Sequence, residues 1–270
     1  MPELPEVQTV VSQLNKRILH HKISKVVIKD TKVVDEIVNS IIGSKVLEVS
    51  RHGKYIIIAL SNNFYLLVHL GMTGHFHFVE INEIEKKKNI YEKYAVAFFN
   101  FDNGSLLTYN SIRKFERIKL LTKEQLNEKI SRLGPDFLSK EFTFEKFEER
   151  LKKRKNANIK TLLMDQKVFA GIGNIYAQEA LYLANIDPRR KVSSLSNEDI
   201  KNIHFQAINL LKNAILHKGS TVDNYSHMEG SGDFQNYLAV YGKKSCPKGH
   251  SLKKINIGGR GTYFCPICQK

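Results

Sequence analysis

The sequence predicts an α+β protein with an N-terminal β-sandwich that starts with a helix, a helical domain and a C-terminal zinc finger. Three observations predict this order. Short apolar runs separated by turn residues fill the first half, helical periodicity follows Leu133-Gly134-Pro135-Asp136, and the three cysteines all lie near the C-terminus. We therefore expect domains at residues 1–133, 134–235 and 236–270, the last containing a β-hairpin.

Composition narrows the class of protein. The chain has 270 residues, 42% of them hydrophobic, which is enough to bury real cores and excludes a disordered tail or a disulfide-stabilised miniprotein. Lys and Arg number 42 against 27 Asp and Glu, a net charge of +15. Such an excess attracts phosphate polyanions or anionic lipid. Nucleic acid is therefore the first partner to expect.

The N-terminal sequence and the cysteines indicate a cellular compartment. Met1-Pro2-Glu3-Leu4-Pro5-Glu6 has acids and prolines where a secretory signal would have a basic and then an apolar stretch. The apolar runs are strand-sized, so no transmembrane helix is expected and no membrane partner. Few cysteines, clustered at one end, do not resemble an extracellular disulfide framework. We expect a cytoplasmic protein in a reducing compartment.

The first half begins with one helix and continues with strands. Val7, Val10, Val11, Leu14 and Ile18 recur at helical spacing, which predicts a helix from Glu6 that the preceding prolines initiate. The charged stretch 84–89 is expected to be a solvated loop. Alternating apolar segments predict strands at 23–28, 45–50, 55–60, 64–69, 75–80, 94–101, 105–109 and 115–120.

Helical segments fill most of the second half. The apolar spacing predicts helices at 144–152, 159–165, 175–183 and 197–217. The stretch 218–233 is rich in Gly, Ser and Asn and has no apolar periodicity. It is too long for a simple connector, so we expect a functional loop.

The cysteines form part of a metal-ligand pattern. Cys246 and His250 make one pair, Cys265 and Cys268 a second, and fourteen residues separate the pairs. Three thiolates and one imidazole suit the tetrahedral preference of structural zinc, and the spacer is long enough for a hairpin. One bound Zn²⁺ is expected, and it would fold a segment too small to fold alone. The alternative is three thiols without a metal beside a surface histidine.

Two further features point to phosphate and to a nucleophile. Gly171-Ile172-Gly173-Asn174 precedes a predicted helix that Asn174 would cap, and amides at a helix N-terminus suit a phosphate. The alternative is a plain turn between helices. Removal of Met1 would expose the amine of Pro2, which titrates near pH 8 and can form an iminium ion with a sugar carbon. The alternative is that the prolines only start a helix.

Taken together, the motifs resemble those of bacterial formamidopyrimidine-DNA glycosylase over essentially the full chain. The resemblance implies a β-sandwich with an N-terminal helix, a helix-two-turn-helix domain and a zinc finger. The motifs that carry it, in chain order, are Pro2-Glu3-Leu4-Pro5-Glu6-Val7, Arg51-His52-Gly53-Lys54-Tyr55, His69-Leu70-Gly71-Met72-Thr73-Gly74, Gly171-Ile172-Gly173-Asn174-Ile175-Tyr176-Ala177, Val240-Tyr241-Gly242, Gly258-Gly259-Arg260 and the zinc-ligand pairs.

The resemblance implies a base-excision repair enzyme that removes oxidised purines from double-stranded DNA and then cleaves the strand. Pro2 is similar to the nucleophile that attacks the deoxyribose C1′, Glu3 to the acid that protonates the sugar ring oxygen, and Glu6 to a supporting carboxylate. Lys54 resembles the lysine that assists β-elimination, and Arg260 the zinc-finger arginine that grips phosphate and assists δ-elimination. A monomer that works on the bacterial nucleoid is expected.

The resemblance also assigns DNA contacts. Met72, Arg113 and Phe115 are similar to the side chains that fill the gap left by an everted base, and the loop 218–233 to one that closes over 8-oxoguanine. Additional DNA-binding positions are His69, Tyr94, Lys114, Lys155, Asn174, Tyr241 and Lys254.

The chain departs from the family pattern at three places. The turn Asn110-Ser111-Ile112-Arg113-Lys114-Phe115-Glu116 lacks the usual proline and glycine, Tyr94 stands where the family has a histidine, and Gly249-His250 takes the place of a cysteine. Two other functions compete. An endonuclease VIII type enzyme would prefer oxidised pyrimidines, but Leu4 argues against it. A non-catalytic, zinc-containing nucleic-acid binder would need only the charge and the zinc.

Overall fold

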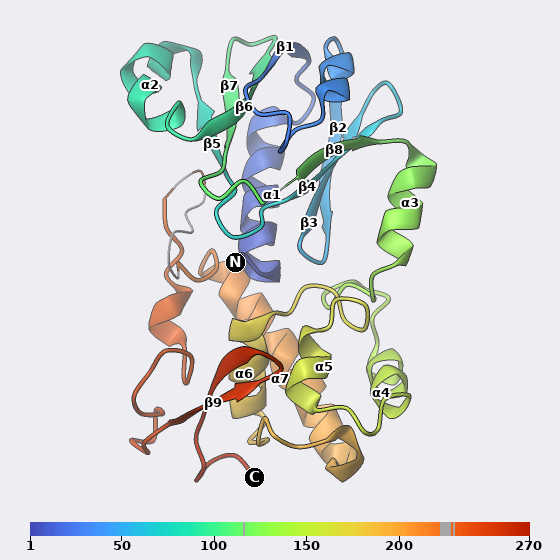
Figure 1. The fold of residues 1–270 in the computed structure, drawn as a ribbon, viewed down its shortest axis with the longest axis vertical. Coiled ribbons are helices and arrows are strands. Elements are labelled where there is room, and N and C mark those ends of the chain that lie inside the picture. Colours follow the sequence, from blue (N-terminus) through green and yellow to red (C-terminus); the bar gives the residue numbers. More distant parts are fainter. Residues whose placement is uncertain (116, 222–227, 229) are drawn as a thin grey trace. The chain divides into compact units, whose positions relative to one another are not determined.

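The computed structural model describes residues 1–115, 117–221, 228 and 230–270. The chain divides into two units: Met1–Ser131 with Lys218–Gly232, and Arg132–His217 with Asp233–Lys270. The segment Lys218–Gly232, expected with the helical domain, therefore groups with the first unit. Figure 1 shows the elements of both units in chain order. Glu116 and most of the expected loop, residues 222–227 and 229, lie outside the described residues.

The first unit begins with helix α1 (Leu4–Ile18). Pro5 lies in its first turn, where a missing N–H costs no helical hydrogen bond. Val7, Leu14 and Ile18 are fully buried on one face, as their spacing predicts. The helix starts two residues earlier than expected, so Glu3 and not a later residue is its N-cap.

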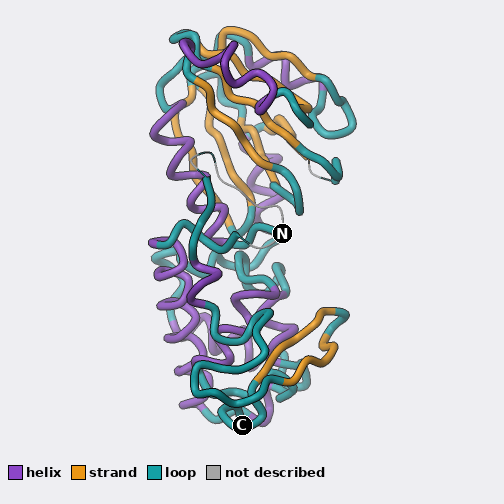
Figure 2. Tube along the Cα trace, turned by 90° about the vertical axis from the view of Figure 1, so that its left-hand side faces the viewer, coloured by secondary structure: helices purple, strands orange, loops and turns teal. Residues whose placement is uncertain are grey.

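Two antiparallel sheets form the rest of this unit. Within the described residues they are four-stranded, with strand orders β1-β6-β7-β5 and β2-β3-β4-β8. Figure 2 shows these strands in orange. The strands are β1 (Ile23–Ile28), β2 (Val46–His52), β3 (Tyr55–Leu60), β4 (Tyr65–His69), β5 (His75–Val79), β6 (Ala95–Phe101), β7 (Leu106–Asn110) and β8 (Arg117–Leu121).

A single apolar core joins the two sheets. Phe76 and Tyr109 of one sheet pack in the same buried cluster as Ile56 and Ile118 of the other, together with Leu14 of α1. Along β3 buried and half-buried residues alternate, because successive side chains of a strand point to opposite faces. The predicted β-sandwich with an N-terminal helix is confirmed.

The expected solvated loop at 84–89 is wrong, because these residues form helix α2 (Ile84–Tyr91). An ion pair one turn apart, Lys87 to Glu83 at 2.7 Å, supports it. Tyr91 is buried in a small apolar cluster against which Ile84 packs. The helix η1 (Glu36–Ile41), the short helix η2 (Ile81–Glu83) and helix α3 (Lys123–Ser131) were not predicted either.

The second unit is helical and packs around aromatic rings. Phe137, Phe147 and Phe169 are fully buried, and Phe137 lies edge-on to both of the others with ring centroids 5.8 Å apart. The helices are α4 (Phe144–Lys152), α5 (Ile159–Met164), α6 (Asn174–Leu183), η3 (Val192–Ser194), α7 (Asn197–Leu216) and η4 (Phe234–Tyr237).

A two-stranded ribbon ends the chain. β9 (Lys253–Ile257) pairs antiparallel with β10 (Arg260–Phe264), so that Ile257 faces Arg260 across the turn. Gly258 and Gly259 have φ of 59° and 73°, a left-handed pair that suits a tight two-residue hairpin. The α+β class with a C-terminal hairpin is confirmed.

Candidate functional site

The start of α1 presents two buried carboxylates beside Pro2. Glu3 and Glu6 are 3% and 2% exposed, and Pro2 is buried as well. The backbone N–H of Glu3 donates to Glu6 Oε2 at 2.7 Å. A carboxylate near a helix N-terminus also interacts favourably with the helix dipole. The first turn of the helix therefore fixes the acidic groups directly next to the expected nucleophile.

The segment after Lys218 binds to the same helix. The backbone N–H of Ser220 donates to Glu6 Oε1 at 2.7 Å, and that of Met228 donates to Gln13 Oε1 at 3.2 Å. Gly219 has φ of +78°, and a Cβ on it would lie 2.7 Å from Glu6 Oε1. Only glycine fits such a close approach without strain. Ser220 and Gly219 are thus site residues that the sequence analysis did not single out.

Lys54 lies in the turn between β2 and β3. Its neighbour Gly53 has φ of 56°, and Lys54 itself is buried. Arg51 donates through Nε to Gln8 Oε1 at 2.8 Å, which ties this hairpin to the second turn of α1. The hairpin that carries Lys54 is therefore attached to α1 within the first unit.

Met72, Arg113 and Phe115 form a cluster on the surface of the sandwich. Arg113 Nη1 lies 3.0 Å from Met72 Sδ, and its guanidinium carbon is 5.0 Å from the centre of the Phe115 ring. Phe115 is 69% exposed and Met72 is 45% exposed. Large apolar side chains are normally buried, so their exposure here suits insertion into a partner.

The turn that carries Arg113 lacks the family's proline and glycine, and side-chain hydrogen bonds stabilise it instead. Asn110 Nδ2 donates to the carbonyl oxygens of Tyr91 and Lys93 at 2.9 and 2.7 Å. The backbone N–H of Lys114 donates to Ser111 Oγ at 2.9 Å. Local side-chain hydrogen bonds of this kind stabilise a turn.

The first unit contains three other predicted DNA-binding residues: His69, Tyr94 and Lys114. His69 Nδ1 accepts from the N–H of Gly71 at 3.0 Å, so in the neutral ring the proton is on Nε2, which then is a donor. Tyr94 is exposed and has φ of 65°. Lys114 Nζ forms an ion pair with Asp30 at 2.8 Å, which lowers the pKa of Asp30 and offsets the lysine's charge.

In the second unit the Gly171–Gly173 turn leads into α6. Gly173, and not Asn174, is the N-cap of this helix, so the predicted cap is wrong by one residue. The Asn174 side chain is instead held by Lys160, whose Nζ donates to Asn174 Oδ1 at 2.7 Å. Lys160 is fully buried. The sequence analysis did not identify Lys160 and assigned a DNA contact to the exposed Lys155 upstream instead.

The ribbon and the segment before it carry the remaining predicted contacts. Arg260 is exposed at the start of β10, and Lys254 Nζ lies 5.2 Å from the centre of the Tyr263 ring. The carboxylate of Glu179 on α6 accepts from the backbone N–H groups of Ala239, Val240 and Tyr241 at 2.7, 2.9 and 2.7 Å. Burial raises the pKa of Glu179 above its usual value, and these three hydrogen bonds offset part of that shift.

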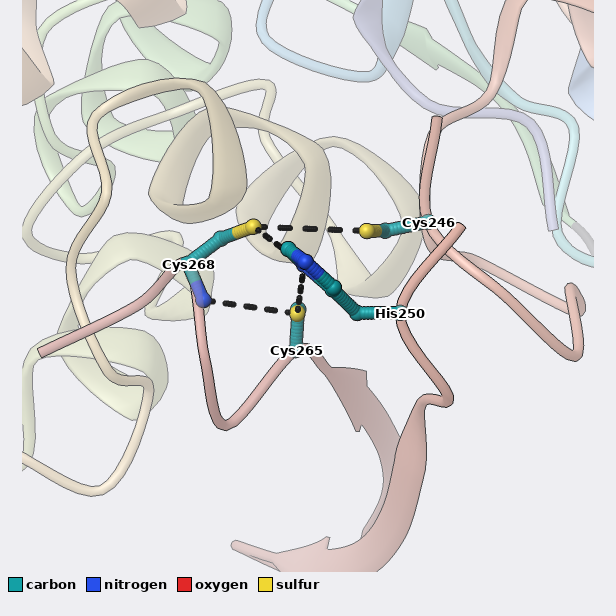
Figure 3. Close-up of side chains that lie close together, drawn as sticks. All are labelled: Cys246, His250, Cys265 and Cys268. Atoms are coloured by element: carbon teal, nitrogen blue, oxygen red, sulfur yellow. Dashed lines mark hydrogen bonds between the residues drawn. The ribbon is translucent and has the colours of Figure 1, made fainter. Parts of the chain in front are cut away.

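The cysteines and His250 converge on one point, as Figure 3 shows. The ligand atoms of Cys246, His250, Cys265 and Cys268 all lie within 4.8 Å of one another. Neighbouring atoms are 4.0 Å (Cys246 and Cys268 Sγ), 3.2 Å (His250 Nδ1 and Cys268 Sγ) and 3.7 Å (Cys265 Sγ and His250 Nδ1) apart. A zinc tetrahedron with Zn–S of about 2.3 Å has edges of about 3.8 Å, so these residues fit the ion.

Neighbouring groups support the zinc ligands. Tyr182 packs against Cys246 and Cys265 and hydrogen-bonds Cys246, and its pKa is raised mainly by burial. Gln269 accepts from the N–H of Cys265 at 2.8 Å and donates to the carbonyl of Ile186 at the same distance. The predicted zinc site, including the unusual His250, is confirmed.

Within each unit the structure brings the predicted residues into groups. Pro2 and Glu3 directly precede α1 and Glu6 lies in its first turn, and the cluster of Met72, Arg113 and Phe115 is formed from two loops of the sandwich. Asn174 lies next to the ribbon, because its Nδ2 donates to the carbonyl of Gly261 at 3.2 Å. The assigned roles of these residues in catalysis and DNA binding stay predictions.

Three family profiles match successive parts of the chain. They are the formamidopyrimidine-DNA glycosylase N-terminal domain at residues 1–118, the H2TH domain of the same enzymes at 133–226, and a zinc finger found in FPG and IleRS at 249–270. The helix-two-turn-helix domain and the zinc finger that the resemblance implied are thereby confirmed.

Whole-chain relatives are also similar. Formamidopyrimidine-DNA glycosylase of Streptococcus mutans is 39% identical and that of Listeria monocytogenes 37%, each over 100% of both chains. A complex of Lactococcus lactis Fpg with abasic-site DNA has a TM-score of 0.89 at 34% identity over 99% of both chains. Another, with THF-containing DNA and an inhibitor, has a TM-score of 0.90 at 34% identity over 100% of both chains.

These findings confirm a DNA glycosylase of base excision repair that carries a zinc finger. Among the described residues, no helix is long and apolar enough to cross a membrane. The motifs, the zinc-ligand set and the match along the entire chain agree with one another, and the chain belongs to the formamidopyrimidine-DNA glycosylase family.

Proposed function

We propose that this protein excises oxidised purines, 8-oxoguanine and formamidopyrimidines, from double-stranded DNA and then cleaves the strand as an AP lyase. The observation that carries the proposal is the buried pair Glu3 and Glu6 beside Pro2 at the start of α1. The relatives are named for formamidopyrimidine, and a similar Lactococcus lactis Fpg structure, at 34% identity, contains Fapy-dG DNA.

The chemistry begins once Met1 is removed. The lone pair of the Pro2 nitrogen attacks C1′ of the damaged nucleotide, and the bond from C1′ to the base breaks with its electron pair on the base. The nitrogen loses its N–H proton, and the departing base takes up one proton. Glu3 in its acid form protonates the sugar ring oxygen as the C1′–O4′ bond opens, which leaves an iminium ion on Pro2. A carboxylate such as Glu6 stabilises the positive charge that develops.

Strand cleavage follows from the iminium ion. Loss of the C2′ proton expels the 3′-phosphate, and loss of the C4′ proton then expels the 5′-phosphate; water finally hydrolyses the iminium and returns the Pro2 amine. Lys54 assists the first elimination and Arg260 the second. The Lys54 ammonium can hold or protonate a leaving phosphate, and the Arg260 guanidinium can hold one by charge and hydrogen bonds.

Binding precedes the chemistry and requires an extruded nucleotide. An enzyme that acts on a base within a duplex must flip it out of the stack, and inserted side chains replace it. The exposed cluster of Met72, Arg113 and Phe115 supplies such side chains, with Arg113 toward the unpaired base. Phosphate contacts come from His69, Lys155, Asn174, Tyr241, Lys254 and Arg260, whereas Lys114 is engaged with Asp30.

We also propose the working boundaries and the setting of the protein. Residues 1–133 carry the nucleophile, 134–235 and the finger at 236–270 grip the DNA backbone, and one monomer suffices for one lesion. The net charge of +15 supports residence on the bacterial nucleoid in the cytoplasm.

Borohydride trapping on an 8-oxoguanine duplex tests this function. Reduction converts the iminium ion into a stable amine, so protein with Pro2 at its terminus should become covalently linked to the DNA. Protein with an uncleaved N-terminal tag should not, because its Pro2 nitrogen is an amide. A pyrimidine-specific enzyme would trap well only on an oxidised pyrimidine, and a non-catalytic binder on neither duplex. Equal trapping by the tagged protein would show that Pro2 is not the nucleophile.

A further inference from the structure

The Gln178 side chain lies on α6 and faces the ribbon. It is 1% exposed. Its Nε2 donates to the carbonyl of Asn174 at 2.7 Å and to that of Gly261 at 3.2 Å, and its Oε1 accepts from the backbone N–H of Tyr263 at 2.6 Å. Both polar atoms of the Gln178 amide therefore form hydrogen bonds. Two of the three partners, Gly261 and Tyr263, belong to the ribbon, so these bonds join it to the helix.

The contact resembles strand pairing. β10 bonds to β9 along one edge, and Gly261 and Tyr263 present a carbonyl and an N–H to Gln178 along the other. A primary amide carries a donor and an acceptor side by side, as a backbone segment does. The side chain thus satisfies the edge of β10 in the way that a third strand would.

Other side chains of α6 bind the backbone next to this contact. The carbonyl of Gly261 also accepts from Asn174 Nδ2 at 3.2 Å, and Asn174 is itself fixed by buried Lys160. Glu179, the next residue on α6, binds the backbone at 239–241. A zinc ion bound by Cys265 and Cys268 would hold the other end of the ribbon. The position of the hairpin tip is therefore set by α6 and not by the metal alone.

Arg260 directly precedes the carbonyl that Gln178 and Asn174 bind. We infer that Gln178 is a positioning residue: it holds the start of β10 so that Arg260 and Asn174 keep a fixed spacing for the DNA backbone. This inference rests on the proposed function of Arg260. Apolar side chains cannot replace the amide, because the partly buried N–H of Tyr263 would then lose the acceptor that Gln178 provides.

The test compares Gln178→Met, a side chain of similar length without the amide, with Gln206→Met on α7 as a matched control. Gln206 Nε2 contacts Asn202 on its own helix, away from the ribbon residues named above. With zinc content unchanged by metal analysis, hydrogen exchange at the Tyr263 amide should accelerate about tenfold or more in Gln178→Met, which corresponds to a loss of about 1.4 kcal/mol. Gln206→Met should leave it at the wild-type rate.

Activity supplies the second readout. At saturating enzyme, Gln178→Met should lower the fraction of δ-elimination product severalfold, while base excision changes less than twofold. In the double variant with Arg260→Ala, Gln178→Met should cause no further loss of δ-elimination product, because both substitutions disable the same function of Arg260. If Gln178→Met does not fold, Gln178→Glu serves in its place. Glutamate keeps the acceptor for the Tyr263 N–H but not the donor to the Gly261 carbonyl. It should therefore give the same product defect, with slower hydrogen exchange at the Tyr263 amide than in Gln178→Met.

The outcomes separate this inference from the proposed function. Unchanged exchange at Tyr263, or additive losses in the double variant, would overturn the positioning role of Gln178. A defect in Arg260→Ala together with wild-type products in Gln178→Met would also overturn it and leave the proposed function intact. Wild-type products in Arg260→Ala would instead disprove the assigned role of Arg260 itself.

Discussion

Ser220 donates its backbone N–H to the carboxylate of Glu6 at 2.7 Å, although 214 residues separate the two in sequence. The second oxygen of the same carboxylate accepts from the N–H of Glu3. Glu6 therefore joins the residue beside the expected nucleophile to the segment that is expected to close over the damaged base. A movement of that segment would therefore directly affect the position of Glu6 at the start of α1.

We predict that Glu6→Gln slows base excision about tenfold. An amide offers one oxygen where the carboxylate offers two, so either Ser220 or Glu3 would face an NH₂ group, at a cost of about 1–3 kcal/mol for a buried donor without an acceptor. Single-turnover excision of 8-oxoguanine measures the effect, with Glu48→Gln on the exposed face of β2 as control. Gly219→Ala should give a similar loss, since its Cβ would collide with Glu6. Wild-type rates in both variants would contradict this role.

Binding and chemistry should respond to different residues. Affinity should fall with salt at a slope of about −0.9 per neutralised phosphate, and Lys155→Ala should make that slope shallower by about one unit on damaged and undamaged DNA alike. Glu3→Gln should abolish excision and leave the slope unchanged, because it removes a proton donor only. One salt titration with parallel excision assays checks both. A shallower slope in Glu3→Gln would contradict its assignment as an acid.

The zinc site predicts one ion per chain. Removal of zinc by a chelator should unfold the Cys246–Cys268 ribbon and weaken DNA binding severalfold while the sandwich stays folded, since metal binding supplies the folding energy of small zinc domains. Metal analysis and hydrogen exchange resolved by segment measure the two effects. His250→Cys should retain zinc, because a thiolate also suits the ion, whereas His250→Ala should lose affinity for it. Active protein that contains no zinc would be the contrary result.

The stability of the sandwich should depend on pH through His77. Burial, and then the neighbouring His75, lowers the pKa of His77 to about 4. Its pKa when unfolded is about 6.5, so below that pH the unfolded chain binds more protons and the free energy of unfolding falls. Because the ring is partly exposed, the loss between pH 7 and pH 5 should be about 1 kcal/mol. Denaturant titrations at both pH values should show a smaller loss in His77→Gln, and an equal loss in both proteins would refute the assignment.

Local patterns in the sequence were sufficient for much of the fold. The spacing of Val7, Leu14 and Ile18 predicted the buried face of α1, and the short apolar run at 55–60 predicted strand β3. Both signals depend on the geometry of one element. Helix α2 escaped prediction because its apolar residues are few and its Tyr91 is buried only by packing with Val79, Phe98 and Leu106 of the sheet.

By itself, then, the sequence determined the zinc ligands, the class of fold and the family, since these depend on spacings within short segments and on motifs that follow one another along the chain. The tertiary structure alone decided which groups meet. Glu6 binds Ser220, Lys160 fixes Asn174, and Gln178 pairs with the edge of β10. Such contacts need hydrogen-bonding atoms within about 3 Å of each other, and only the packing of distant elements sets distances that small.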